Sequence, residues 1–185
     1  MQFVVVSATL GLIYRQLRVQ AAAHVVQSLS TIHTRWNSET MIRARQQVCS
    51  GWVAGRREFD GVAEYVAEFM EELGIYLRIH AIPAREMWEA QSWYIEHYYC
   101  MFKPGIEQVR QRYKDENLYT QFEALYELMD KLNRQQHSPH FKRDDEDITA
   151  FARSELAMAD AFLKLRSGPR DVAQLDRSKE LAPRP

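Results

Sequence analysis

The closest grouping of chemically competent side chains is Glu96, His97 and Cys100, which fall within about one turn of a predicted helix. A histidine and a cysteine three residues apart on a helix can bind one metal ion, but a zinc site needs about four ligands and no nearby segment supplies the others. A di-iron bundle needs a glutamate three places before a histidine, and none of the six histidines has one. We therefore expect no metal and no cofactor, with His97 and Cys100 as core residues.

The carboxylates Glu68, Glu71 and Glu72 offer a second possible site, for acid–base catalysis. Such catalysis needs a carboxyl group held in an apolar pocket, whereas a run of carboxylates on one helical side is usually solvated. The sequence has no glycine-rich phosphate loop, no Gly-x-Ser-x-Gly turn and no kinase signature. We assign no catalytic residue and favour a protein that is not an enzyme. The alternative left open is a soluble helical enzyme or small-ligand-binding protein, with a pocket lined by Glu71, His97 and nearby tyrosines.

Aromatic side chains are dense in the segment 84–102. Because they lie on more than one side of the predicted helix, the segment is typical of a central helix packed by several neighbours. The functional alternative is an exposed patch that receives a partner or ligand, since aromatic residues dominate interface hot spots. The residues of this possible patch are Trp88, Trp93, Tyr94, His97, Tyr98 and Tyr99.

The opening run of the chain is apolar on all sides, carries no charge and ends at Arg15 and Arg18. As a helix, the residues before Arg15 would measure roughly 21 Å, against a hydrocarbon core of roughly 30 Å. Arginine side chains can extend to the head groups, and the positive flank leaves the rest of the chain on the cytoplasmic side. We predict a single membrane-inserted helix in the inner membrane. Its anchor residues are Phe3, Val4, Val5, Val6, Leu10, Leu12, Ile13 and Tyr14.

Other interpretations of the opening run stay open. A run this short is also typical of a buried core helix, which the later helices would enclose. A signal peptide would need a charged region before its apolar core, and only Gln2 stands there. A strand is suggested by Val4 to Val6, but no second strand-like segment is available to pair with it. A natural start upstream of Met1 would lengthen the span.

The net charge of −1 gives the whole chain no electrostatic attraction for nucleic acid. The charge is unevenly distributed: residues 1–57 sum to +6 and residues 58–101 to −7. A basic segment beside an apolar run suits the anionic cytoplasmic face of a bilayer. Pairing of these arginines with the acidic helices explains the pattern equally well. We expect the membrane as a partner, together with an unknown protein partner or self-association, and no nucleic acid.

Hydrophobic residues recur at helical spacing through most of the chain, so the sequence predicts an all-α fold. We expect an N-terminal membrane and stem helix followed by an irregular bundle of four to five helices. The expected segments are a membrane helix and amphipathic stem over 1–35, a bundle over 36–135, a polar loop over 136–147, an additional helix over 148–167 and a disordered tail over 168–185.

Local signals mark the ends of the predicted helices. Ser38 and Asp60 are expected to cap the second and third helices. The dipeptide at 104–105, Pro-Gly, is expected to break or kink the fourth. Cys49 and Cys100 match no paired motif, and we expect free, buried thiols in a reducing compartment.

Packing patterns in four segments carry a resemblance to a known family. They are 36–39 (Trp-Asn-Ser-Glu), 68–78 (Glu-Phe-Met-Glu-Glu-Leu-Gly-Ile-Tyr-Leu-Arg), 82–99 with its Trp and Tyr residues, and 112–123. Here the chain resembles an uncharacterised bacterial family whose members have one N-terminal membrane helix followed by a small helical domain of unknown function. The resemblance spans residues 16–129 and implies a topology of anchor, stem and compact bundle. It implies no activity and no site residues.

Overall fold

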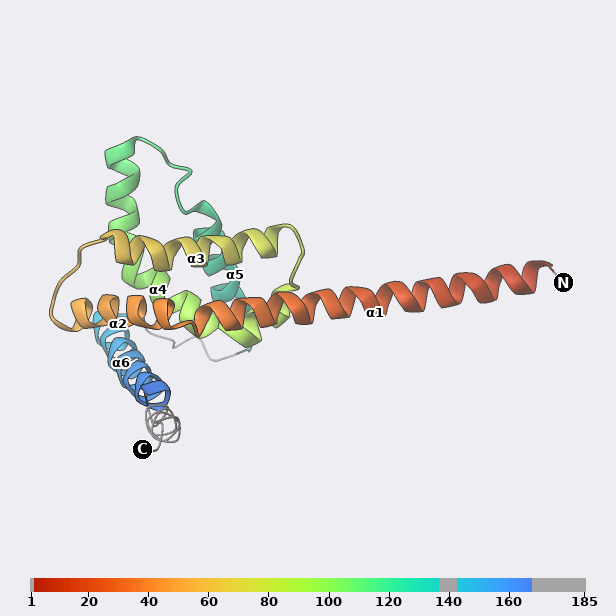
Figure 1. The fold of residues 1–185 in the computed structure, drawn as a ribbon. Helices are drawn as coiled ribbons and strands as arrows, with labels where there is room; N and C mark the ends of the chain where they lie inside the picture. Colours follow the sequence, from red (N-terminus) through yellow and green to blue (C-terminus); the bar gives the residue numbers. More distant parts are fainter. Residues whose placement is uncertain (1, 137–142, 168–185) are drawn as a thin grey trace, which may run out of the picture.

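A computed structural model describes residues 2–136 and 143–167 of the chain, with side chains from residue 13 to residue 166 within these ranges. The two ranges contain six α-helices and no strand (Figure 1). The helices are α1 (Gln2–Trp36), α2 (Glu39–Val53), α3 (Gly61–Arg78), α4 (Ala84–Tyr113), α5 (Thr120–Gln136) and α6 (Asp145–Ser167). The predicted all-α fold, one long first helix and a bundle of further helices, is confirmed over this part of the chain.

Two helices begin at the capping residues that the sequence predicted. The Ser38 hydroxyl accepts a hydrogen bond from the Met41 amide at 3.3 Å. A carboxylate oxygen of Asp60 accepts from the Val62 and Ala63 amides, at 3.0 Å each. Both caps satisfy backbone donors that lack a partner in the first turn of a helix. Only residues 37–38 separate α1 from α2, and in Figure 1 α2 continues almost in line with α1.

Of the break or kink predicted at residues 104–105, the break does not occur, because α4 continues as one helix through both residues. Proline removes a backbone hydrogen bond from a helix and crowds the preceding turn. Packing offsets this local cost, since Gly105 and Ile106 are both buried. A β-carbon added to Gly105 would lie 2.3 Å from Cβ of Phe59, so the loop between α2 and α3 lies directly against the helix here.

The bundle consists of α2 to α6, with the end of α1 packed into it. Helix α6 packs chiefly on α2, α5 packs on α3 and α4, and α2 also packs on α3. The apolar stripe of α5 faces the core, because Phe122, Leu125 and Met129, at helical spacing, are fully buried. Cys49 is buried, Cys100 is half-buried, and both thiols are free.

Helices α3 and α5 approach each other closely at one glycine. A β-carbon added to Gly74 would lie 2.2 Å from the carbonyl oxygen of Gln121, whereas non-bonded carbon atoms rest at about 3.5–4.0 Å. The Glu71 carboxylate, one turn earlier on α3, accepts hydrogen bonds from the amides of Gln121 and Phe122 at 3.2 and 2.6 Å. An acidic side chain of α3 therefore caps the first turn of α5, where negative charge is favourable.

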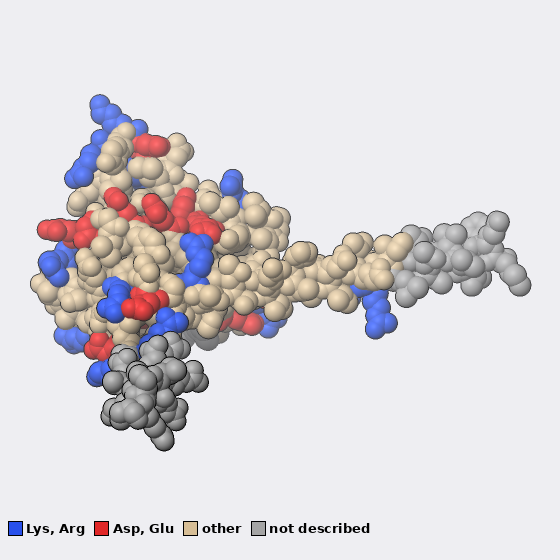
Figure 2. All heavy atoms as spheres, in the orientation of Figure 1, with Lys and Arg blue, Asp and Glu red and all other residues tan. Residues whose placement is uncertain are grey.

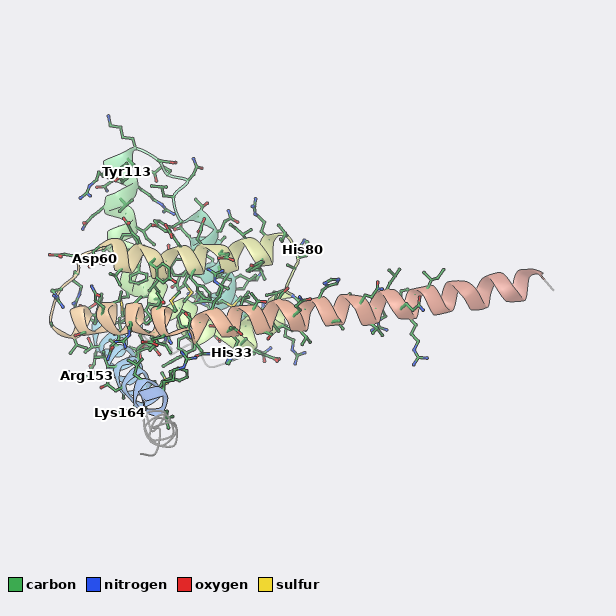
Figure 3. All side chains as sticks on the ribbon, in the orientation of Figure 1. His33, Asp60, His80, Tyr113, Arg153 and Lys164 are labelled. Atoms are coloured by element: carbon green, nitrogen blue, oxygen red, sulfur yellow. The ribbon has the colours of Figure 1, made fainter. Side chains whose placement is uncertain are left out.

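Helix α1 extends well beyond the bundle. Past the loop that holds His80, no other described element runs beside it (Figures 1 and 3). Among its described side chains, only Ile32 and Trp36 are buried. At 1.5 Å per residue, the helical residues before Ile32 form a rod of roughly 45 Å. Over residues 2–136 and 143–167, no helix combines the length and the apolar character that crossing a membrane requires.

Two predicted segments lie wholly or partly outside the described residues. Of the predicted loop 136–147, residues 137–142 lie outside the description. The predicted disordered tail 168–185 lies wholly outside it. Helix α6 begins at Asp145, three residues before the predicted start at 148. Its first turn contains Asp145, Glu146 and Asp147, and negative charge stabilises the N-terminal end of a helix.

Candidate functional site

The described part of α1 outside the bundle presents apolar side chains to solvent. The exposed fractions are 46% for Ile13, 64% for Tyr14, 58% for Leu17, 63% for Val19 and 67% for Val26. Figure 2 shows this part of the helix as largely uncharged, with basic and no acidic atoms in view. The alternative in which the opening run forms the core of the bundle therefore does not hold for Ile13 and Tyr14.

The predicted anchor residues and the basic pair share this one helix. Ile13, Tyr14, Arg15 and Arg18 are all exposed. Because a helix turns by about 100° per residue, the neighbours Ile13 and Tyr14 project in different directions. The other predicted anchor residues lie in the helical stretch 2–12, whose side chains are outside the description; they are Phe3, Val4, Val5, Val6, Leu10 and Leu12.

Trp36 fixes the base of α1 to the bundle. Its ring centroid lies 5.3 Å from that of Phe69 on α3, and 5.0 and 5.9 Å from those of Tyr94 and Tyr98 on α4. The guanidinium of Arg45 on α2 lies 4.0 Å from the same ring. Aromatic pairs and cation–π contacts each contribute about 0.5–1.5 kcal/mol beyond simple burial. One side chain of α1 thus contacts three helices of the bundle.

An ion pair between Arg35 and Glu72 adds a second contact between α1 and α3. Nη1 of Arg35 lies 2.6 Å from each carboxylate oxygen of Glu72, and the Tyr76 hydroxyl donates to Glu72 at 2.9 Å. Burial alone would raise the pKa of Glu72, but the hydrogen bonds from Arg35 and Tyr76 outweigh it and lower that pKa below 4.5. Arg35 thus follows the second explanation of the charge pattern, in which N-terminal arginines pair with the acidic helices.

The residues of the possible aromatic patch do not form one exposed surface. They comprise the buried His97, Tyr98 and Tyr99, the half-buried Trp88 and Tyr94, and Trp93, which is 40% exposed. Tyr99 stacks on Tyr126 of α5 at 4.2 Å, and Trp93 contacts Phe151 of α6 at 4.9 Å. Since neighbouring helices cover α4 on several sides, its aromatic residues belong mainly to the core.

Glu96 belongs to a buried ion pair rather than to a metal site. One carboxylate oxygen accepts a hydrogen bond from Asn133 at 2.6 Å, and the other contacts the Arg143 guanidinium. Arg143 also donates to Asp130 at 2.6 Å. Burial raises the pKa of Glu96; at Asp130, hydrogen bonds from Arg143 and Arg134 outweigh burial and lower the pKa. These contacts attach the residues just before α6 to α4 and α5.

His97 is held by packing and by contacts with α4 and α6. Its Nδ1 lies 2.6 Å from the Trp93 carbonyl oxygen, its Nε2 lies 3.3 Å from the Asp147 carboxylate, and its ring stacks on Phe151 at 4.6 Å. Cys100, about one turn later, is half-buried, and burial raises the pKa of its thiol. Within the described residues, no three His, Cys, Asp or Glu side chains are placed to hold a metal ion.

The predicted carboxylate run does not assemble an acid–base site. Glu71 caps α5, Glu72 pairs with Arg35, and Glu68 is exposed. Glu71 therefore contacts amides at the start of α5, whereas His97 contacts the start of α6. The two side chains thus lie at different helix junctions, and these contacts do not support the expected pocket lined by both.

A buried charged cluster that the sequence did not indicate joins α2, α4 and α6. Nη1 of Arg45 lies 2.7 Å from Oε2 of Glu155, and the Tyr98 hydroxyl donates to the same oxygen at 2.9 Å. Sγ of Cys49 lies 3.6 Å from that hydroxyl. No motif or periodicity links Arg45 with a glutamate 110 positions later. In the sequence Arg43 stands two positions before Arg45, and Arg153 stands two positions before Glu155, so neither charge was marked out as buried.

The chemistry of this cluster is structural rather than nucleophilic. Burial raises the pKa of the Cys49 thiol to about 12, and burial also raises the pKa of Tyr98 well above 10. The thiolate is the nucleophilic form of cysteine, and a thiol with this pKa is almost entirely protonated near neutral pH. Cys49 therefore acts as a buried packing residue and not as a nucleophile.

A cleft of about 330 Å³ lies beside the cluster, between α6 and the junction of α1 and α2. Its lining includes the buried Arg45 and Glu155 and the apolar Met158, Phe162 and Leu165 of α6. Helix α6 thus contributes both the buried carboxylate and the exposed apolar side chains of one cleft.

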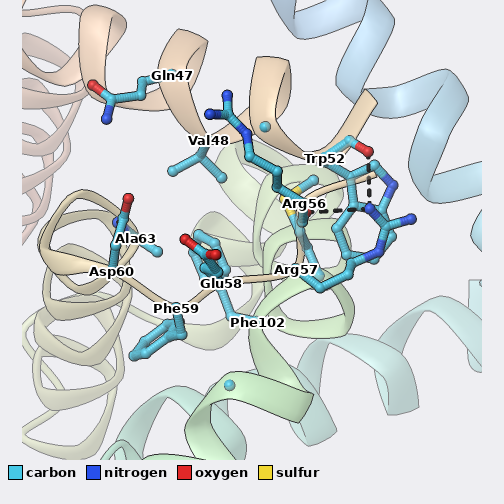
Figure 4. Close-up of a pocket in the computed structure, with 13 residues that line it drawn as sticks. Gln47, Val48, Trp52, Arg56, Arg57, Glu58, Phe59, Asp60, Ala63 and Phe102 are labelled. Atoms are coloured by element: carbon cyan, nitrogen blue, oxygen red, sulfur yellow. Dashed lines mark hydrogen bonds between the residues drawn. The ribbon is translucent and has the colours of Figure 1, made fainter. Parts of the chain in front are cut away.

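A smaller cavity of about 80 Å³ lies between α2, α4 and the loop 54–60 (Figure 4). Arg57 lies 3.6 Å from the Trp52 ring and donates to the carbonyl oxygens of Trp52 and Arg56, at 2.9 and 3.2 Å. Asp60, also in its lining, is the cap of α3. The cavity has room for about two or three water molecules, and we assign it no ligand.

No family model, curated protein or solved structure matches this chain. The functional argument therefore rests on the geometry. Its two leading features are the exposed apolar part of α1, fixed to the bundle by Trp36, and the cleft beside Arg45 and Glu155.

Proposed function

We propose that this protein is a membrane-attached, non-enzymatic interaction domain. The N-terminal part of α1 enters the lipid of the cytoplasmic membrane, and the bundle lies on the cytoplasmic side. The observation that carries the proposal is the exposure of apolar side chains on a helix that leaves the bundle. Apolar surface in water is disfavoured by about 25 cal/mol per Å² relative to burial, and contact with lipid removes this cost.

The charge distribution on α1 supports insertion as far as Tyr14. Residues 2–36 contain no Asp or Glu, and the first basic residues are Arg15 and Arg18. A helix ending at Tyr14 reaches roughly 20 Å into the lipid, which is less than the roughly 30 Å of the hydrocarbon core. The two guanidinium groups stay among the phosphate head groups, where anionic lipid attracts them.

The part of α1 between the lipid and the bundle is the contact for a second copy of the chain. Val19 and Val26 are exposed and seven residues apart, with Ala22 between them at the spacing of a heptad. Apolar residues at this spacing pair helices side by side. So short a stripe pairs weakly alone, and attachment to one membrane raises the effective concentration of the two stems.

Flotation with lipid vesicles tests the attachment. The full chain is mixed with vesicles of phosphatidylcholine, with or without phosphatidylglycerol, and centrifuged through a density gradient. We expect it to float with both, and more completely with the anionic vesicles. The double variant Leu10→Glu/Ile13→Glu should stay at the bottom, because charged residues enter hydrocarbon at a cost of about 2.5–3.5 kcal/mol each.

A matched control replaces exposed apolar residues of the bundle instead. Ile79 and Tyr113 are 59% and 67% exposed, and Ile79→Glu/Tyr113→Glu should float like the natural sequence. Circular dichroism on the same samples checks that each variant is folded. Recovery of the folded natural chain at the bottom of both gradients would overturn the membrane proposal.

Self-association is measured separately, by analytical ultracentrifugation of the full chain in detergent micelles. We expect a dimer, and we expect Val19→Glu/Val26→Glu to yield a monomer that still floats with vesicles. A monomer in the natural sequence would remove the stem contact and leave the lipid attachment standing.

A further inference from the structure

Glu155 is a buried charge on α6, and both groups that donate hydrogen bonds to it also contact Trp36 of α1. Its Oε2 accepts from Nη1 of Arg45 at 2.7 Å and from the Tyr98 hydroxyl at 2.9 Å. The Trp36 ring lies 4.0 Å from the Arg45 guanidinium and 5.9 Å from the Tyr98 ring. The Trp36 carbonyl oxygen also accepts from Nη2 of Arg45 at 3.4 Å. The base of α1 therefore contacts both donors that bind the carboxylate of α6.

Helix α6 is attached to the bundle by few buried apolar side chains. Among its described side chains, the buried apolar ones larger than alanine are Ile148 and Phe151, both in the first two turns. From residue 156 onward, Ala159 alone among the described side chains is buried. Glu155 lies between these two parts. Its other oxygen, Oε1, has no hydrogen bond within the described residues, so the carboxylate depends on its two donors at Oε2.

A buried ion pair is sensitive to small displacements. Taking a carboxylate and a guanidinium out of water is costly, and their attraction offsets the cost only where the geometry is good. The Trp36 ring stabilises the guanidinium of Arg45 by a cation–π contact, which is strongest where water is excluded. Loss of this ring therefore gives Arg45 more freedom to move and weakens its bond to Glu155.

We propose that the docking of α1 and the docking of α6 are coupled through Arg45 and Tyr98. While Trp36 is in place, the two donors are held where Glu155 needs them and α6 stays attached. When Trp36 is displaced, both donors move, and α6 detaches from α2 and α4 as a local event. The rest of the bundle stays folded, because α5 packs on α3 and α4 rather than on α6.

Detachment uncovers the surface of α2 and α4 on which α6 lies. At this surface Nε1 of Trp52 donates to the Thr149 hydroxyl at 3.2 Å, and the Trp93 ring lies 4.9 Å from that of Phe151. A coupling between two sites is reciprocal, so detachment of α6 also weakens the docking of the α1 base. The surface that this domain presents therefore depends on the position of its first helix.

Hydrogen exchange followed by mass spectrometry tests the coupling on the full chain in detergent micelles. Peptides from residues 148–163 report the detachment of α6, and peptides from residues 121–133 of α5 are the reference in the same sample. Trp36→Leu keeps an apolar side chain but removes the ring beside the two donors. We expect exchange in α6 to become at least tenfold faster relative to α5 than in the natural sequence. Trp36→Phe keeps a smaller ring, should give an intermediate increase, and replaces Trp36→Leu if circular dichroism shows that variant to be unfolded.

Two controls separate the coupling from a general loss of stability. Ile32 and Trp36 are each 3% exposed, and Ile32 lies one turn further from α2. Ile32→Ala should leave the ratio of α6 to α5 exchange within twofold of that in the natural sequence, because Trp36 keeps its place. The second control removes the connection itself. In the Arg45→Met/Glu155→Leu background, Trp36→Leu should accelerate exchange in α6 no more than in α5.

Three results would overturn the proposal. The first is an unchanged ratio of α6 to α5 exchange in the folded Trp36 variants. The second is an increase for Ile32→Ala as large as that for Trp36→Leu, which would assign the effect to general loosening of α1. The third is an equally large effect of Trp36→Leu in the Arg45→Met/Glu155→Leu background, which would exclude the ion pair as the connection.

Discussion

Arg45 on α2 and Glu155 on α6 lie 110 positions apart in the sequence, and Nη1 of the arginine lies 2.7 Å from Oε2 of the glutamate inside the protein. This pair fixes the last helix to the bundle at a buried position. The Gln46 amide donates to Asp160 at 2.7 Å in the same interface but at the surface, where hydrogen bonds compete with water. The buried pair should therefore dominate the polar contribution to this interface.

Removal of one partner of this pair should destabilise the protein strongly. Glu155→Ala leaves Arg45 charged, buried and unpaired, and the free energy of unfolding should fall by about 3–5 kcal/mol. Arg45→Met/Glu155→Leu should recover most of that loss, because an apolar pair of similar volume often replaces a buried ion pair at little cost. Urea unfolding followed by circular dichroism measures both. A double variant as unstable as Glu155→Ala would show that the charges themselves are needed.

The close approach of α3 to α5 predicts a large effect for one methyl group. Gly74→Ala places a β-carbon against the Gln121 backbone, and overpacking of this kind costs about 1–3 kcal/mol. Gly61→Ala, at the start of the same helix and with open space around it, should instead stabilise by about 0.5 kcal/mol, because alanine restricts the unfolded chain. Thermal unfolding of the two variants measures opposite shifts in Tm. Equal shifts would contradict the close approach.

The lowered pKa of Asp130 predicts how stability depends on pH. Its folded-state pKa lies below the ordinary 3.8, so its contribution is fully present above pH 3.8 and is lost as the pH falls through the folded value. Asp130→Asn should lower the free energy of unfolding near neutral pH by about 1.5–3 kcal/mol, the value of a hydrogen bond to a charged group, and should flatten the acid side of the profile. Urea unfolding across a pH series measures both effects.

An exposed carboxylate on the same helix provides the control for this profile. Glu127→Gln should follow the natural sequence at every pH, because Glu127 is exposed on α5. An acid profile as steep in Asp130→Asn as in the natural sequence would assign the acid sensitivity to other carboxylates, such as Glu72 and Glu123, whose pKa values are also lowered.

Shortening α1 distinguishes its exposed part from its base. Removal of residues 1–24 should change the free energy of unfolding by less than about 0.5 kcal/mol, because the buried residues of the helix lie later. Removal of residues 1–36 also deletes Ile32 and Trp36 and should cost about 3–5 kcal/mol or more. Circular dichroism during urea unfolding measures both. If the protein that lacks residues 1–24 were unfolded, the interpretation of the opening run as part of the core would be restored.

Much of the fold followed from the sequence because its signals are local. The caps at Ser38 and Asp60 and the buried stripe at Phe122, Leu125 and Met129 depend on neighbours within a few residues. The chain does not break at residues 104–105, where a break or a kink was predicted, because a distant side chain, Phe59, packs against Gly105 and offsets the local cost of proline.

The candidate site was less predictable because it depends on contacts between distant segments. The sequence favoured a central, packed helix for α4, and the burial of Tyr98 and Tyr99 agrees with it, but helical periodicity did not identify which neighbours cover them. The Arg45–Glu155 pair joins two helices whose relative placement no sequence period specifies. The apolar run on α1 was recognisable in the sequence, since a stretch without charges needs no distant partner to be identified.

The short connection between α1 and α2 makes the first helix a lever. Helix α1 is continuous over roughly 52 Å, so a force on its far end is transmitted along it, and only residues 37–38 separate it from α2. Rotation of the rod would turn about Trp36, whose ring supports the Arg45 guanidinium at 4.0 Å. Arg45 is hydrogen-bonded to Glu155 of α6. A rotation of α1 would therefore also shift the contact between α2 and α6 and change the width of the cleft beside it.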